Sequence, residues 1–118
     1  MNFSPDGGPS FRFKTEGEEV RLRCDGVVYP NCSSTTWIFE SERTSDSAAL
    51  VTHGVIKKDP GRVERLSLGS DCSLNVRRVN TEDAGRYTCQ QYLTEGGSQH
   101  GEDASIYLIV ETSKYVSF

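Results

Sequence analysis

The chain has 118 residues, a formal net charge of -4 and a pI near 5.1. That length fits one domain and excludes a two-domain enzyme. Hydrophobic residues make up 35% of the sequence, which indicates the thin core of a small sandwich or barrel. The acidic balance argues against a protein that coats nucleic acid or an acidic membrane surface, because such proteins carry a basic excess.

Short alternating segments follow one another along the chain, and none keeps a helical period over roughly 11 residues. In the first segment, Val20, Leu22 and Cys24 alternate with arginines, which predicts an antiparallel strand with one buried face. Similar alternation returns in segments 35–39, 74–76, 87–89 and 105–110. Polar, Gly- and Ser-rich loops are predicted at 41–48 and 95–103. The sequence therefore predicts an all-β fold.

The four cysteines are Cys24, Cys32, Cys72 and Cys89. An even number in a short chain predicts two disulfides and an oxidising compartment. A zinc site is the alternative. It is disfavoured because the cysteines form no C-x-x-C pair and neither His53 nor His100 lies close to one of them.

No signal segment is visible, because the residues after Met1 are polar or small, and Met1 is therefore expected to be an added start. The longest apolar run, Ile106 to Val110, is far shorter than the roughly 20 residues that cross a bilayer. We expect a soluble piece of a single-pass membrane protein, with the anchor beyond Phe118.

No catalytic or cofactor motif emerges from the sequence. The two histidines belong to no Asp-His-Ser or His-rich group and are interpreted as solvated loop residues. The serines form no G-x-S-x-G, and the glycines form no G-x-G-x-x-G. We therefore expect no enzyme activity, no cofactor and no metal.

Three features together resemble the immunoglobulin superfamily. Cys24 is followed by Trp37 in the next predicted strand, and Cys89 ends the stretch D-A-G-R-Y-T-C at 83–89. In immunoglobulin domains an inter-sheet disulfide packs on a buried tryptophan, and a tyrosine-corner residue precedes the second cysteine by two positions, where Tyr87 stands. The wide separation of the two cysteines resembles the V-set subclass, since it leaves room for two additional strands.

The resemblance implies one V-type β-sandwich over residues 1–118, with an ordered core at about 10–113 and two antiparallel sheets, ABED and GFCC′C″. The implied strands are A near 10–14, B at 18–25, C at 35–40, C′ at 48–53, C″ at about 55–58, D at 63–68, E at 72–79, F at 85–92 and G at 104–112. Trp37, Tyr87 and Leu74 are expected in the core.

The resemblance also implies specific pairings. Cys24 should bond Cys89 between the sheets, and Cys32 in the B–C loop should bond Cys72 at the start of strand E. V-set domains commonly pair an arginine at the start of strand D with the aspartate before strand F. Here that pair would be Arg65 and Asp83, with Arg62 as the alternative arginine.

Two departures separate the chain from antibody and T-cell-receptor chains. Residues 100–107 lack their aromatic-Gly-x-Gly motif, and Glu40 occupies the position of a glutamine that pairs across their dimer. Two Glu40 carboxylates meeting at a twofold axis would repel each other unless a cation such as Arg43 intervened. We therefore expect a monomer, or a weak homodimer of different geometry, that resembles a non-rearranging immune-type receptor.

The resemblance implies a ligand-recognition ectodomain of an immune-type cell-surface receptor, on the extracellular side of the plasma membrane. It would bind a protein partner, and no nucleic acid, through its GFCC′ face and adjacent loops. The candidate contact residues are Ile38, Glu40, Gln90, Tyr92, Leu93, Gln99 and His100. A homophilic cell-adhesion module is the alternative, and an antigen-binding variable domain is disfavoured by the missing motif. Asn2 and Asn31 match the N-glycosylation pattern.

Overall fold

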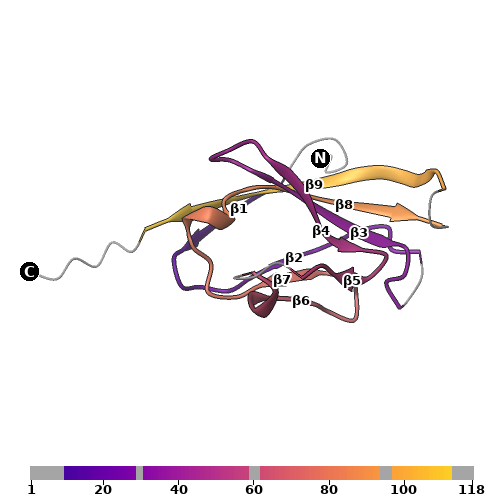
Figure 1. The fold of residues 1–118 in the computed structure, drawn as a ribbon, viewed down its shortest axis with the longest axis horizontal. Coiled ribbons are helices and arrows are strands. Elements are labelled where there is room, and N and C mark those ends of the chain that lie inside the picture. The colour runs from indigo at the N-terminus through magenta and orange to yellow at the C-terminus, as the bar shows by residue number, and fades with distance from the viewer. Residues whose placement is uncertain (1–9, 29–30, 59–61, 94–96, 113–118) are drawn as a thin grey trace, which may run out of the picture.

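The computed structural model describes residues 10–28, 31–58, 62–93 and 97–112 (Figure 1). Their strands are β1 (Ser10–Thr15), β2 (Val20–Leu22), β3 (Thr35–Ser41), β4 (Ser47–Thr52), β5 (Val55–Ile56), β6 (Leu66–Leu68), β7 (Leu74–Val76), β8 (Gly85–Tyr92) and β9 (Gln99–Glu111). Two short 3-10 helices, η1 (Val63–Arg65) and η2 (Thr81–Asp83), connect strands at one end of the molecule.

The strands form two sheets that face each other (Figure 1). The larger sheet has the order β1-β9-β8-β3-β4-β5, and the smaller has the order β2-β7-β6. This arrangement confirms the predicted all-β V-type sandwich.

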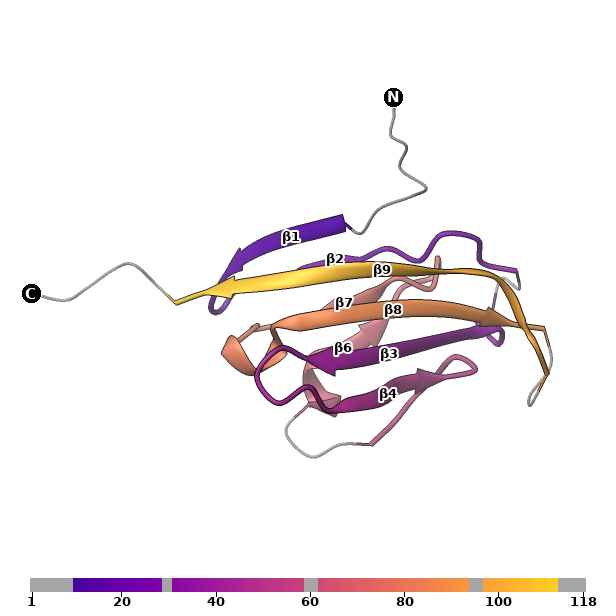
Figure 2. The same cartoon turned by 90° about the horizontal axis from the view of Figure 1, so that it is seen from above.

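The first strand departs from the predicted sheet order. β1 does not join the smaller sheet but pairs in parallel with β9, from Ser10 opposite Ile106 to Thr15 opposite Glu111. The placement of strand A beside strand B was therefore wrong, as was the expectation that both sheets are purely antiparallel. The pairing with β9 stacks the ring of Phe11 on that of Tyr107, with centroids 5.4 Å apart. Figure 2 shows β1 beside β9 at the edge of the larger sheet.

The last strand is longer than predicted. β9 starts at Gln99 and not at residue 104, so much of the predicted loop 95–103 is a strand paired with β8. The register shifts between Cys89 and Gln91, and Gly101 there has a φ of 79°, a left-handed conformation that glycine adopts without strain. A polar, glycine-containing segment thus extends the hairpin through a bulge.

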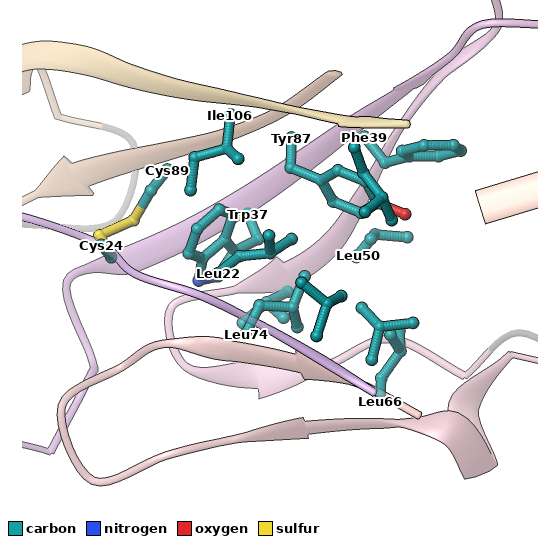
Figure 3. Close-up of a cluster of buried hydrophobic side chains, with 14 of the residues drawn as sticks. Leu22, Cys24, Trp37, Phe39, Leu50, Leu66, Leu74, Tyr87, Cys89 and Ile106 are labelled. Carbon is teal, nitrogen blue, oxygen red and sulfur yellow. A yellow bond between two sulfur atoms is a disulfide. The ribbon is translucent and has the colours of Figure 1, made fainter. Parts of the chain in front are cut away.

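The core lies between the sheets and contains the predicted Trp37, Tyr87 and Leu74, each with a relative exposure of 0%. Figure 3 shows Trp37 beside the Cys24–Cys89 disulfide and Tyr87 beside Phe39. The indole N–H of Trp37 donates to the carbonyl of Cys72 at 3.0 Å, so its one polar atom has a partner despite burial.

Both predicted disulfides are confirmed. Cys24 is bonded to Cys89 with a Cα–Cα distance of 5.7 Å, and Cys32 is bonded to Cys72 with a Cα–Cα distance of 5.5 Å. Since these bonds use all four cysteines, the thiolates that a zinc site would need are not free.

Strand β8 connects two ends of the sandwich that differ in their chemistry. We call the end where it begins, beside Asp83, the clamp pole. We call the end where it finishes, beside Tyr92 and the Cys32–Cys72 disulfide, the loop pole. At the loop pole, the end of β8 is linked to the connection that carries Cys32, because the backbone N–H of Tyr92 donates to the carbonyl of Ser34.

Candidate recognition face

At the clamp pole the structure places both candidate arginines on one carboxylate. Asp83, with 0% exposure, lies 2.7 Å from a guanidinium nitrogen of Arg65 and 2.8 Å from one of Arg62. Arg62 is therefore a second partner and not an alternative to Arg65. Its guanidinium also lies 4.4 Å from the centroid of the Phe39 ring.

Asp83 is held ionised by its neighbours. Burial alone would raise its pKa, but the hydrogen bonds from Arg65 and Arg62 outweigh that effect and lower the pKa below its ordinary value. The hydroxyl of Tyr87 donates to the carbonyl of Asp83 at 2.6 Å, and burial raises the pKa of Tyr87. The carboxylate of Asp83 and the hydroxyl of Tyr87 both have their partners inside the fold, so we interpret the clamp as structural.

The solvent-facing side of β3, β8 and β9 presents the predicted contact residues. Trp37 and Phe39 are buried, while Ile38 and Glu40, which alternate with them, are partly exposed. We call this surface the recognition face and define it by its outward residues, which are Ile38, Glu40, Arg86, Gln90, Tyr92, Gln99 and Asp103.

One charge pair lies on this face within the same chain. Arg86 contacts Glu40 across neighbouring strands at 2.7 Å, and both side chains are about half exposed. Arg86, and not Arg43, is therefore the cation that neutralises Glu40. The argument that two Glu40 carboxylates would repel each other in a face-to-face dimer loses most of its force as a result.

Toward the loop pole, three predicted contact residues form one hydrogen-bond network, in which two of them bind the carboxylate of Asp103. Tyr92 donates its hydroxyl to the side-chain oxygen of Gln90 at 3.2 Å. The amide of Gln90 donates to both Asp103 oxygens, at 3.2 and 3.3 Å, and the amide of Gln99 also donates to Asp103. Sequence analysis did not identify Asp103 as a site residue, because it placed residues 95–103 in a loop. Gly101, a frequent bulge residue within an alternating hairpin, is the signal that could have found it.

The other two predicted contacts lie apart from this network. Leu93 is 44% exposed and immediately follows β8. His100 pairs with the inward Gln91, so alternation places it on the opposite face of β9 from Gln99. The structure therefore does not bring His100 together with the recognition face.

His53 lies beside Tyr92 and departs from its interpretation as a solvated loop residue. It is partly buried, its Nδ1 lies 3.0 Å from the carbonyl oxygen of Ser33, and its ring centroid is 6.3 Å from that of Tyr92. The turn between β4 and β5 thus extends the aromatic part of the recognition face.

Gln91 lies on the inward side of β8, beneath the recognition face, and hydrogen-bonds the neighbouring segments. Its buried side-chain oxygen accepts from the hydroxyl of Ser34 at 2.6 Å and from the N–H of Val28 at 3.3 Å, while its amide donates to Thr35 at 3.0 Å. Sequence analysis did not single out Gln91. Its inward position in the alternation of β8 is the signal that could have done so.

Other predicted features of the chain are located as follows. Asn31 is exposed, and its side chain accepts from the N–H of Ser33 at 3.1 Å, whereas Asn2 lies outside the described residues. Across the described ranges no group of three or more His, Cys, Asp or Glu could hold a metal ion. In that same part of the chain no helix is long and apolar enough to cross a membrane.

Comparison with known proteins identifies the family. The model of the immunoglobulin V-set domain matches residues 8–110, and the chain therefore belongs to the V-set family. It is 29% identical over 110 residues to the Protein turtle of Drosophila melanogaster, covering 93% of this chain but 6% of that protein. Among solved structures it is similar to Drosophila Semaphorin 2a, with a TM-score of 0.60 and 22% identity over 90% of this chain and 15% of the other. This chain thus spans a small fraction of either protein, and the structural similarity supports the fold alone.

Proposed function

We propose that this V-set domain is the ligand-recognition ectodomain of an immune-type cell-surface receptor, anchored on the outer side of the plasma membrane. It binds a protein partner through the recognition face and the loops of the loop pole. V-set membership is consistent with such a role, and two disulfides fit an oxidising extracellular setting.

The observation that carries this proposal is the arrangement around Tyr92. Partly exposed Ile38 and the ring of Tyr92 offer apolar contact, and the network centred on Asp103 offers polar groups on the same outward face. Leu93, exposed immediately after β8, adds an apolar side chain at the loop pole. Protein interfaces combine an apolar centre with a polar rim in this way. Because Gln90, Gln99 and Tyr92 are already hydrogen-bonded to one another or to Asp103, less side-chain freedom is lost when a partner binds.

The proposal is tested by screening the oxidised, multimerised domain against a panel of extracellular proteins. Each hit is then measured with Ile38→Arg and with Ser67→Arg, a matched control at the exposed position of β6 in the opposite sheet. We expect binding to fall at least about tenfold with Ile38→Arg and to stay unchanged with Ser67→Arg. Equal binding by both variants would contradict the assignment of the recognition face.

A homophilic adhesion module is a second candidate, and the Glu40–Arg86 pair favours it. Since each face carries both charge signs side by side, two such faces can meet without net repulsion. Sedimentation velocity over a wide concentration range distinguishes the two functions. Self-association that Ile38→Arg abolishes supports homophilic adhesion, whereas binding only to a different protein supports the receptor.

A further inference from the structure

A second surface on the larger sheet carries exposed aromatic side chains on β1, the outermost strand among the described residues. Phe11 is 55% exposed and Phe13 is 64% exposed, which places both among the large apolar side chains most exposed in the described residues. The register of β1 and β9 sets Phe11 beside Tyr107 and Phe13 beside Ile109. We call these four residues the β1–β9 patch. Contiguous exposed apolar groups of this kind mark interaction sites in soluble proteins.

The patch favours contact through its face and not through the strand edge. β1 is the outermost strand of its sheet, and Arg12 and Lys14 alternate with the two phenylalanines. Charged side chains on an edge strand disfavour the addition of another strand, and two copies paired there would bring these cations together. By alternation, the phenylalanines lie on the face of β1 opposite to that of Arg12 and Lys14. There they can pack against an apolar surface.

Opposite charges lie near the two ends of the patch. Arg86, on β8, is the register partner of Tyr107 and therefore lies beside the patch at one end. At the other end is Glu111, which is exposed and shares the outward face of β9 with Tyr107 and Ile109 by alternation. Four residues of β9 separate the ends, or roughly 13 Å. Along the strand direction, the cation and the anion therefore lie on opposite sides of the row of Phe13 and Ile109.

This arrangement is complementary to itself under a twofold rotation. If a second copy is turned about an axis across the strands at the row of Phe13 and Ile109, those side chains meet their own copies. Arg86 of each molecule then lies near Glu111 of the other. The cis partner of Arg86, Glu40, is solvent-exposed, so Arg86 can exchange or share it. An isologous contact requires a surface that complements itself in this way.

We propose that the β1–β9 patch binds a second copy of this chain in a twofold, face-to-face dimer. This surface and partner go beyond the proposed receptor function, which rests on the Ile38–Tyr92 region. Four side chains supply the apolar centre of an interface but less than the roughly 800 Å² per partner of a standard complex, so the dimer is weak. It differs in geometry from a dimer centred on Ile38.

Sedimentation velocity on the oxidised chain, up to millimolar concentration, tests the proposal. Phe13→Glu should weaken self-association at least about tenfold, because it places two carboxylates at the twofold axis. Val55→Glu is the matched control, since Val55 is 67% exposed on β5 at the opposite edge of the sheet. It should leave self-association unchanged.

A charge exchange identifies the partner as a second copy. In a Glu40→Gln background, which removes the cis carboxylate, Glu111→Arg should weaken the dimer about tenfold, and adding Arg86→Glu should restore most of the loss. Circular dichroism and melting curves check that each variant is folded. A chain that stays monomeric at every concentration would overturn the proposal, as would a dimer that Phe13→Glu leaves intact. Loss with Ile38→Arg but not Phe13→Glu would assign self-association to the recognition face instead.

Discussion

The two poles of the sandwich hold their segments together by different means. At the clamp pole, the fully buried carboxylate of Asp83 binds two arginines, so its charge is not accessible to a partner. At the loop pole, a disulfide and the buried amide of Gln91 hold the connections, and the network of Asp103 remains at the surface. A pole that satisfies its polar groups internally has little to offer a partner. The comparison therefore gives both poles a share in stability, assigns no recognition to the clamp pole, and assigns recognition to the outward face that ends at the loop pole. Four predictions follow in order of expected size.

The largest effect is expected from Cys32→Ser combined with Cys72→Ser at the loop pole. Opening the loop of 40 residues should lower the free energy of unfolding by about 4 kcal/mol on chain entropy. We expect the fold to remain, the melting temperature to fall and amide exchange to speed up in residues 31–34. A non-reducing peptide map of the wild-type chain provides the check on pairing, and a peptide joining Cys24 to Cys32 would contradict the account.

At the clamp pole, Asp83→Ala should lower the free energy of unfolding by about 3 kcal/mol. The change leaves the guanidinium groups of Arg62 and Arg65 without their shared anion in a largely buried setting. Glu82→Ala, at an exposed neighbouring position, is the control and should change stability by less than about 0.5 kcal/mol. Chemical denaturation measures both variants, and equal effects would argue against the clamp.

Acid should remove the contribution of Asp83 without any mutation. Because the pKa of Asp83 is lower in the folded chain than its unfolded value of about 3.9, its stabilisation is present above that value and is lost as the pH falls through the folded pKa. The difference in unfolding free energy between wild type and Asp83→Asn should therefore shrink below about pH 4. The pKa of Asp71, lowered to about 2 chiefly by the backbone N–H of Ser73, is expected to affect both proteins alike. A difference that stays constant down to pH 2 would contradict this prediction.

Two neighbouring glutamines give the finest test of the comparison. Gln91→Ala should lower the free energy of unfolding by about 2 kcal/mol, because the hydrogen bonds of Gln91 with buried Ser34 and Thr35 are lost. Gln90→Ala, one residue away on the exposed face, should cost less than about 0.5 kcal/mol. Thermal unfolding of both variants measures the difference, and a larger effect at Gln90 would reverse the roles assigned to the two residues.

Much of the fold could be predicted from the sequence because the signals were local or strongly constrained. Period-two alternation identified the strands, and the order of Cys24, Trp37 and Cys89 with Tyr87 identified the sandwich. The position of β1 could not be predicted in this way. Its residues alternate aromatic and basic side chains, and that pattern does not specify which sheet edge the strand pairs with.

The candidate site was predicted less completely than the fold. Ile38, Glu40, Gln90 and Tyr92 follow from parity along strands whose register is fixed by buried neighbours. Asp103 and the strand character of Gln99 depend on a bulge at Gly101, which shifts the register and moves side chains to a new row. Contacts between distant segments, such as His53 with Tyr92, depend on tertiary packing that local patterns do not encode.

The most direct test of the account is a substitution scan of the domain displayed on a cell surface, with two measurements made on every variant. Surface expression reports folding, and binding to a partner captured in the screen reports recognition. We predict that substitutions at Asp83, Arg65 and Tyr87 reduce expression, while those at Ile38 and Tyr92 reduce binding with expression unchanged. Binding lost at the clamp pole in well-expressed variants, with Ile38 and Tyr92 freely substituted, would contradict the assignment of binding to the recognition face.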